Sequence, residues 1–172
     1  LPDRVIYFFQ AYEDDYLKRI REFRDTCTEI IGDSGIQICV ENTAGFLDFQ
    51  RRAVEALLES PAFSLTFDIG HNYCAKNMDE DWILTHGERL RHMHVHDACD
   101  GTKDHRTLGT GELDVMRYLN IAEEQDCTVV LETKTPASSS ILNTRRILLR
   151  SYLVVFSRTI THSRPVSSSS RG

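Results

Sequence analysis

The sequence lacks the features that would place it in a membrane or in the secretory pathway. Its 172 residues contain no apolar run of roughly 18 residues, the length that a membrane-spanning helix needs. No signal peptide is visible at the start, where the first residue is Leu rather than Met. We therefore expect a protein that works away from membranes, with its native N-terminus upstream of Leu1.

Cysteine pairs of the C-x-x-C type are also missing. The five cysteines are an odd number and lie scattered along the chain, at Cys27, Cys39, Cys74, Cys99 and Cys127. This spacing argues against both a disulfide framework and a zinc ribbon. It favours ordinary buried or half-buried thiols in a reducing, cytoplasmic setting.

The chain also has no excess of positive charge. The chain has 20 Lys and Arg against 26 Asp and Glu, a formal net charge of -6. This argues against capture of nucleic-acid phosphates by the chain as a whole, and leaves only a local basic patch open. With 41% hydrophobic and 27% charged residues, the composition is that of a globular protein with room for one sizeable core.

What the sequence does contain is an alternation of helical and strand patterns. Apolar residues recur with a helical period at 12–31, 47–58, 79–88, 115–124 and 141–150, and short β-branched runs lie at 36–41, 63–68, 90–96 and 128–132. Residues 4–9 fit either a further strand or the start of the first helix. The alternation predicts βαβ units and a parallel sheet.

The predicted domain covers residues 1–150, and the remaining segment differs from it in composition. Residues 151–172 contain arginines but no acidic residue, and they end in the low-complexity stretch SSSSRG. We expect this segment to be a disordered or non-native tail.

Each predicted strand has one apolar face and one polar face. In 90–96, for example, Met93 and Val95 alternate with His92, His94 and His96. A doubly wound sheet is covered on both faces and should be apolar on both, whereas a barrel has helices only on its outside. The pattern favours a (β/α)₈ TIM barrel. Since such a barrel needs about 250 residues, we expect its C-terminal half here.

A metal-capable side chain lies near the C-terminal end of each predicted strand. These residues are Glu41, Asp68, His94 and Glu132. Active sites of TIM barrels lie at this end of the strands. Three carboxylates and an imidazole suit a divalent metal ion such as Mn²⁺, Mg²⁺, Co²⁺ or Zn²⁺. An acid at a strand end is often only a helix cap, but four consecutive strands ending in this way predict a metal site.

At these positions the sequence resembles the xylose-isomerase-like barrel superfamily. This superfamily includes sugar and sugar-phosphate isomerases and epimerases, and DNA-repair enzymes of the endonuclease IV type. The matching stretches are ICVENTAG (38–45), LTFDIGHN (65–72), HVHDACDGTKDHRTLGTGELD (94–114) and VVLETK (129–134). The resemblance implies a partial TIM barrel of xylose-isomerase type in which Glu41, Asp68, His94 and Glu132 bind one metal. In this superfamily the ligand histidine lies three residues before an acid. This favours His94, three residues before Asp97, rather than His96 as the ligand.

The resemblance also implies roles for the other histidines. His71 matches the histidine of a D-x-x-H pattern, which contacts substrate in the isomerases and binds an additional zinc in the endonucleases. His105, four residues before Gly109, matches a histidine in both branches and is expected to begin a loop over the substrate or another ion. His92 and His96 are expected in the wall of the site or behind the ligands.

Two enzymatic functions and one non-enzymatic interpretation remain open at this point. The ENTAG stretch favours an AP endonuclease, but Lys103 stands where the endonuclease uses a zinc-binding aspartate, and the nearest acid is Asp104. Together with the negative net charge, this favours a small-molecule substrate, a sugar or sugar phosphate. The third interpretation is a truncated, non-catalytic fragment, which exposes sheet edges and is unstable alone or forms a homo-oligomer.

For the isomerase or epimerase, the predicted roles follow from the chemistry of the side chains. Glu41 and Glu132 would remove and return the proton beside a carbonyl, through an enediolate. Lys103 and Arg106 would bind a substrate phosphate or carboxylate, although a solvated surface charge is an equal alternative for each.

Overall fold

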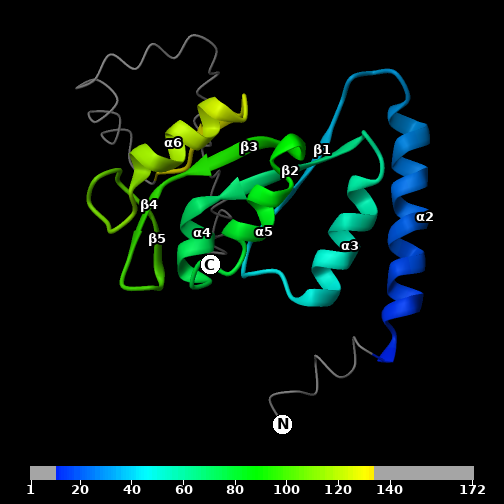
Figure 1. Ribbon diagram of the computed structural model, residues 1–172, viewed down its shortest axis with the longest axis horizontal. Coiled ribbons are helices and arrows are strands. Elements are labelled where there is room, and N and C mark those ends of the chain that lie inside the picture. Colours follow the sequence, from blue (N-terminus) through cyan, green and yellow to red (C-terminus); the bar gives the residue numbers. More distant parts are fainter. Residues whose placement is uncertain (1–10, 134–172) are drawn as a thin grey trace, which may run out of the picture.

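The computed structural model describes residues 11–133, in which four parallel strands form one sheet in the order β1-β2-β3-β6 (Figure 1). The strands are β1 Ile38–Glu41, β2 Phe63–Asp68, β3 Leu90–Val95 and β6 Thr128–Leu131. Helix α2 Glu13–Ile31 precedes β1, and the helices between the strands are α3 Asp48–Leu58, α4 Ile69–Cys74, α5 Glu80–Thr85, the 3₁₀ turn η1 Gly87–Arg89 and α6 Val115–Glu124. The four strands of this parallel sheet are half the number in a complete (β/α)₈ barrel.

The predicted alternation of strands and helices is confirmed over the described residues. The strand at 63–68 and the helix at 115–124 have the predicted bounds. The first strand begins at Ile38 rather than at residue 36, and Ile36 is 62% exposed. The helix expected at 79–88 ends at Thr85 and continues as a 3₁₀ turn. The predictions for residues 4–9, 141–150 and 151–172 lie outside the described residues.

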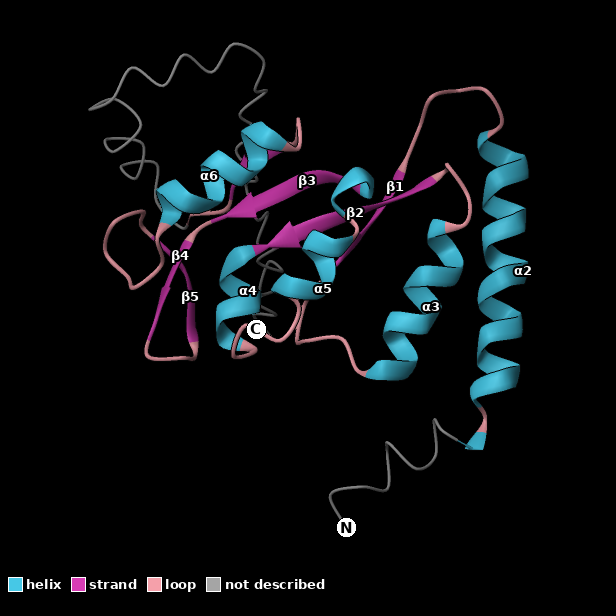
Figure 2. Cartoon of the chain, in the orientation of Figure 1, coloured by secondary structure: helices cyan, strands magenta, loops and turns pink. Residues whose placement is uncertain are grey.

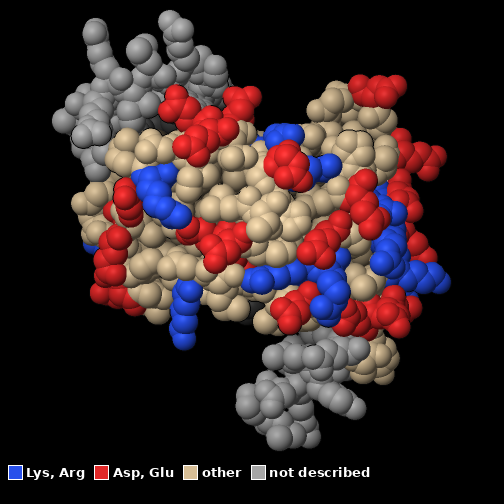
Figure 3. Space-filling model, in the orientation of Figure 1, with Lys and Arg blue, Asp and Glu red and all other residues tan. Residues whose placement is uncertain are grey.

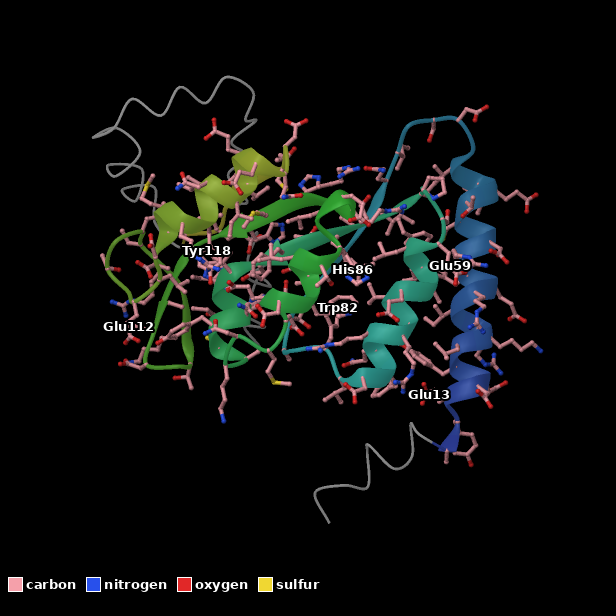
Figure 4. The ribbon with its side chains drawn as sticks, viewed as in Figure 1. Glu13, Glu59, Trp82, His86, Glu112 and Tyr118 are labelled. Atoms are coloured by element: carbon pink, nitrogen blue, oxygen red, sulfur yellow. The ribbon has the colours of Figure 1, made fainter. Side chains whose placement is uncertain are left out.

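The outer face of the sheet is apolar, as the alternation predicts, and it carries the core. Phe67, Met93 and Val95 are completely buried, and Val129 and Leu131 are each 5% exposed. Phe67 packs edge-to-face on Tyr118 of α6, with ring centroids 5.9 Å apart (Figure 4 labels Tyr118). Each such side chain stabilises the fold by about 1.5–3 kcal/mol when it is fully buried.

Helices α2 and α3 lie side by side (Figure 1), and α3 contacts β2 of the sheet. Glu13 of α2 pairs with Arg52 of α3, and Glu59, just after α3, pairs with Arg24 of α2. Figure 4 shows the two glutamates at opposite ends of this helix pair. None of the helices described in residues 11–133 combines the length and the apolar character needed to cross a membrane.

The strand register brings the polar inner face together at one end of the sheet. Asp68 of β2 lies opposite His94 of β3, while Glu41 of β1 lies opposite Thr66, one inward-facing position lower. Glu132 comes directly after β6, and its backbone N–H donates to the carbonyl of Val95 at 3.2 Å. Because all four strands are parallel, their C-terminal ends meet here, as expected for a barrel active site.

A two-stranded antiparallel hairpin extends beyond β3 and was not predicted. It consists of β4 Asp97–Cys99 and β5 Lys103–Arg106 (Figure 2). Its turn contains Asp100 and Gly101, with φ angles of 56° and 68°, as in the tight turns that suit the twist of a hairpin. His105 therefore lies within a strand, and the expectation that it begins a loop is wrong.

The segment after the hairpin is held by a single buried carboxylate, Asp97. Its Oδ1 accepts hydrogen bonds from the backbone N–H groups of Ala98 and Leu113, at 2.9 and 3.2 Å. Its Oδ2 accepts from those of Gly109 and Gly111, both at 2.8 Å. A Cβ atom on Gly111 would lie 2.2 Å from Oδ1, so only glycine allows this approach. The GTG stretch therefore has a structural role as an anchored turn.

Candidate metal centre

The four residues predicted from the strand ends converge in the structure. The Nδ1 atom of His94 lies 3.3 Å from Oε1 of Glu41, 3.4 Å from Oε1 of Glu132 and 3.8 Å from Oδ2 of Asp68. Asp68 is fully buried, and the other three side chains are 20–30% exposed. The cluster therefore lies at the boundary between the sheet and the solvent, where a small molecule can reach it.

His71 joins this cluster from the first turn of α4. Asp68 caps that helix, since its Oδ1 accepts the backbone N–H of His71 at 2.7 Å. The cap turns the His71 side chain inward, and its Nδ1 lies 3.5 Å from both Glu41 Oε1 and Asp68 Oδ2. The resemblance implied either a substrate contact or an additional zinc for His71, and the structure places its Nδ1 beside the carboxylates of the cluster.

The chemistry and spacing of these atoms fit a divalent cation. Within the described residues, Nδ1 of His71 and Nδ1 of His94 are buried and have no hydrogen-bond partner. Buried polar atoms normally form hydrogen bonds, so two imidazole nitrogens that face carboxylates without forming one need an explanation. Ligands that bind one ion at about 2.0–2.2 Å lie roughly 3–3.5 Å from one another. The closest of the observed separations fall in this range.

The charges of the cluster also favour a cation. Burial alone would raise the pKa of Asp68, but the hydrogen bond from His96 and the nearby histidines lower it. For His94, burial acts to lower the pKa, and the neighbouring Glu41, Glu132 and Asp68 raise it overall. The site therefore contains an ionised Asp68 and further carboxylates around His94, and this negative charge attracts a cation.

A second group of polar side chains lies beside the four residues, and most of its interactions were not predicted. His105 Nε2 lies 3.3 Å from Glu132 Oε2, and its Nδ1 lies 3.0 Å from Asp104 Oδ1. Asp104 Oδ2 in turn lies 3.8 Å from Nε2 of His71. His105 was predicted from its position four residues before Gly109. The contacts of Asp104 were not predicted, because they depend on the hairpin.

The two predicted substrate-binding cations lie on the hairpin, beside the cluster. Lys103 and Arg106 line a pocket of about 510 Å³ whose wall includes Asp104 and His105 and three threonines, Thr102, Thr107 and Thr110. Lys103 is 61% exposed and pairs with Asp100 at 2.6 Å. The Arg106 Nε atom is buried and has no hydrogen-bond partner within the described residues. The pocket and the cluster thus share a wall.

On the face drawn in Figure 3, acidic and basic side chains of the described residues are interspersed. No continuous basic patch covers this face, in keeping with the net charge of -6.

Comparison with known proteins gives a consistent result. A family model described as "Xylose isomerase-like TIM barrel" matches residues 5–150. The uncharacterized protein MJ1311 of Methanocaldococcus jannaschii is 26% identical over 173 residues, which cover 96% of this chain and 59% of that protein. MJ1614 from the same organism is 27% identical over 113 residues, covering 64% of this chain and 44% of that protein.

A solved structure agrees with these sequence relatives. The crystal structure of a D-tagatose 3-epimerase-like protein matches with a TM-score of 0.57 and 25% identity, covering 80% of this chain and 55% of that one. The chain therefore spans well under two thirds of the length of each relative.

Proposed function

Because the chain belongs to the xylose isomerase-like TIM barrel family, we propose that it carries the metal centre of a sugar or sugar-phosphate isomerase or epimerase. The main support is the convergence of Glu41, Asp68, His94 and Glu132 around the bare Nδ1 atom of His94. The epimerase-like description of the structural relative supports the same reaction class. The five free cysteines are consistent with the reducing, cytoplasmic setting that we propose for it.

The proposed chemistry is proton transfer between two carbons of a sugar. A divalent cation held by Glu41, Asp68, His94 and Glu132 would supply Lewis-acid polarisation of a carbonyl oxygen and its neighbouring hydroxyl. Glu41 and Glu132 reach His94 Nδ1 from the two edge strands of the described sheet. One of them removes the proton beside the carbonyl to form an enediolate, and the other returns it.

The remaining predicted residues are proposed to hold the substrate. His71 and His105 border the cluster and can donate hydrogen bonds to sugar hydroxyls. Lys103 and Arg106 are proposed to bind a phosphate or carboxylate in the pocket on the hairpin. Asp104 and His105 line the pocket, and they also contact His71 and Glu132 at the cluster. We therefore propose that one small molecule occupies both.

The test of this function is an isomerisation assay with the metals that the donor set suits. The protein, prepared with Mn²⁺, Mg²⁺, Co²⁺ or Zn²⁺, is incubated with a panel of ketoses, aldoses and their phosphates. We expect interconversion that a chelator abolishes and that metal restores. The same preparation should leave abasic DNA intact, and strong nicking of that DNA, abolished by chelator, would instead establish the endonuclease.

The endonuclease remains the second candidate because of one observation. Asp104 lies 3.8 Å from Nε2 of His71 and 3.0 Å from Nδ1 of His105, so these three side chains form a further group of potential metal ligands next to the first. The fragment interpretation has its own support, since the outer edges of β1 and β6 have no partner strand in the described part of the chain. Measurement of hydrodynamic size and a thermal melting curve would show whether the chain is a stable monomer or a homo-oligomer.

The proposed anion site gives a prediction for Arg106. Replacing Arg106 with glutamine should raise KM for a sugar phosphate by about 10–100-fold, because hydrogen bonds to charged groups contribute about 1.5–3 kcal/mol. The value of kcat should stay close to that of the parent, since the phosphate is held equally in the ground and transition states. Lys18→Gln, an exposed change on α2, is the matched control. A fall in kcat with KM unchanged would contradict the assignment.

A further inference from the structure

His96 is the most deeply buried histidine of the described residues, and it forms hydrogen bonds on both sides of its ring. It is 0% exposed and comes directly after β3. Its Nε2 lies 3.0 and 3.1 Å from the two carboxylate oxygens of Asp68. Its Nδ1 lies 2.8 Å from the backbone nitrogen of His105, in β5. The ring therefore connects the hairpin to a proposed metal ligand.

These two contacts determine which ring nitrogen carries the proton. A backbone N–H can only donate, and the His105 nitrogen lies closer to Nδ1 of His96, at 2.8 Å, than the carbonyl oxygen of Asp97 does, at 3.4 Å; we therefore assign Nδ1 as the unprotonated acceptor of the hydrogen bond from His105. Nε2 then carries the proton and donates it to the Asp68 carboxylate. Because both nitrogens are engaged, His96 is not free to bind a metal, although it lies near Asp68 and Glu132.

The fold encloses the His96 ring tightly between two elements. On one side is Gly70 of α4, where an added Cβ atom would lie 1.9 Å from Cε1 of His96. On the other side the ring of His105 stacks at 4.1 Å with an interplanar angle of 10°. His105 has a φ angle of 51°, a left-handed conformation that non-glycine residues rarely adopt. Such local strain persists only where the surrounding structure holds it.

From this arrangement we propose that His96 is a positioning residue that couples the β4–β5 hairpin to the metal centre. His96 forms a hydrogen bond to Asp68. Oδ2 of Asp68 also faces the Nδ1 atoms of His71 and His94, which have no hydrogen-bond partner within the described residues. On its other side His96 holds the backbone of β5, the strand that carries Arg106 and lines the pocket. A ligand that displaces β5 therefore shifts His96, and with it the orientation of Asp68. This inference rests on the proposed function only in taking Asp68 as a metal ligand.

Two substitutions separate the two hydrogen bonds. In His96→Asn the short amide can still accept from the His105 N–H but does not reach Asp68. In His96→Gln the longer amide can still donate to Asp68 but offers no acceptor at the position of Nδ1. His86→Gln is the matched control, since His86 follows α5 and contacts Trp82 instead (Figure 4).

The measurements are Mn²⁺ affinity and hydrogen exchange of the His105 amide. We expect His96→Asn to weaken Mn²⁺ binding by about 10–100-fold, as is typical when a group that orients a ligand is lost. Exchange of the His105 amide should stay close to the parent's rate in this variant. In His96→Gln, Mn²⁺ affinity should be retained within about threefold, and the His105 amide should exchange at least about tenfold faster. Equal losses of Mn²⁺ affinity in the two variants would overturn the proposal.

Nitrogen NMR of the unmodified chain provides a test that requires no variant. The spectrum should show a bare Nδ1 and a protonated Nε2 for His96, and a proton on Nδ1 would refute the coupling. If the unmodified chain binds no Mn²⁺, the metal centre itself is refuted. If it binds Mn²⁺ and the two variants do not differ, only the role of His96 is refuted.

Discussion

Replacing Glu132 with glutamine is expected to lower turnover of the proposed isomerase by about 10²–10⁴-fold, the usual contribution of general acid–base catalysis. Glutamine keeps the shape of the side chain and can still offer an oxygen to a metal, but it cannot accept a proton as a carboxylate does. The fold should remain intact, because the neighbouring Val129 and Leu131 provide the buried packing and Glu132 is 22% exposed.

Loss of metal affinity and loss of proton transfer can be separated by saturating the variant with Mn²⁺. If the rate then returns to nearly that of the parent, Glu132 is only a ligand, and the proton-transfer role belongs to another residue. Glu124→Gln, an exposed change at the end of α6, provides the control for a lost carboxylate away from the site. It should leave both Mn²⁺ affinity and turnover unchanged.

The largest effect on stability is expected for Asp97→Ala. This change leaves four backbone N–H groups without their acceptor, in a position that is 0% exposed. Since a hydrogen bond to a charged group contributes about 1.5–3 kcal/mol and such losses are not additive, we expect the free energy of unfolding to fall by about 3–5 kcal/mol. The corresponding decrease in Tm is roughly 6–20 °C for a chain of this size.

Two further variants make the Asp97 prediction specific. Asp97→Asn should not restore stability, because both carboxylate oxygens accept from backbone donors and an amide NH₂ would face two of them. Glu29→Ala removes an exposed acid on α2, away from this network, and should change stability by less than about 0.5 kcal/mol. Thermal melting of the three variants decides the matter. Full stability of Asp97→Asn would contradict the assigned network.

The parallel sheet and the main cluster could be predicted because they depend on short-range patterns. Strands with one apolar face are visible in stretches such as FSLTFD, and parallel strands necessarily bring their C-terminal ends to one edge. Glu41, Asp68, His94 and Glu132 therefore meet without any knowledge of the loops. Their proposed role as ligands remains a prediction, since the geometry fits a cation without identifying one.

The hairpin and the interactions of His96 could not be obtained in the same way. Asp100-Gly101 is a common hairpin turn, but the stretch KDHR that follows it has no apolar alternation to indicate a strand. The burial of His96 depends on Gly70, which lies 26 residues earlier and becomes its neighbour only when α4 packs against β3. Periodicity describes neighbours within an element, whereas these contacts arise between elements.

Asn42, directly after β1, connects this end of the strand to the backbone of Asp68. Its side-chain amide donates to the carbonyl of Asp68 at 3.0 Å and accepts the Asp68 N–H at 2.9 Å, so it takes the place of a peptide group from a neighbouring strand. An aspartate at this position would replace the donor with a negatively charged oxygen facing the carbonyl of Asp68. The backbone position of a proposed metal ligand therefore depends on one neutral amide that lies 26 residues earlier in the chain.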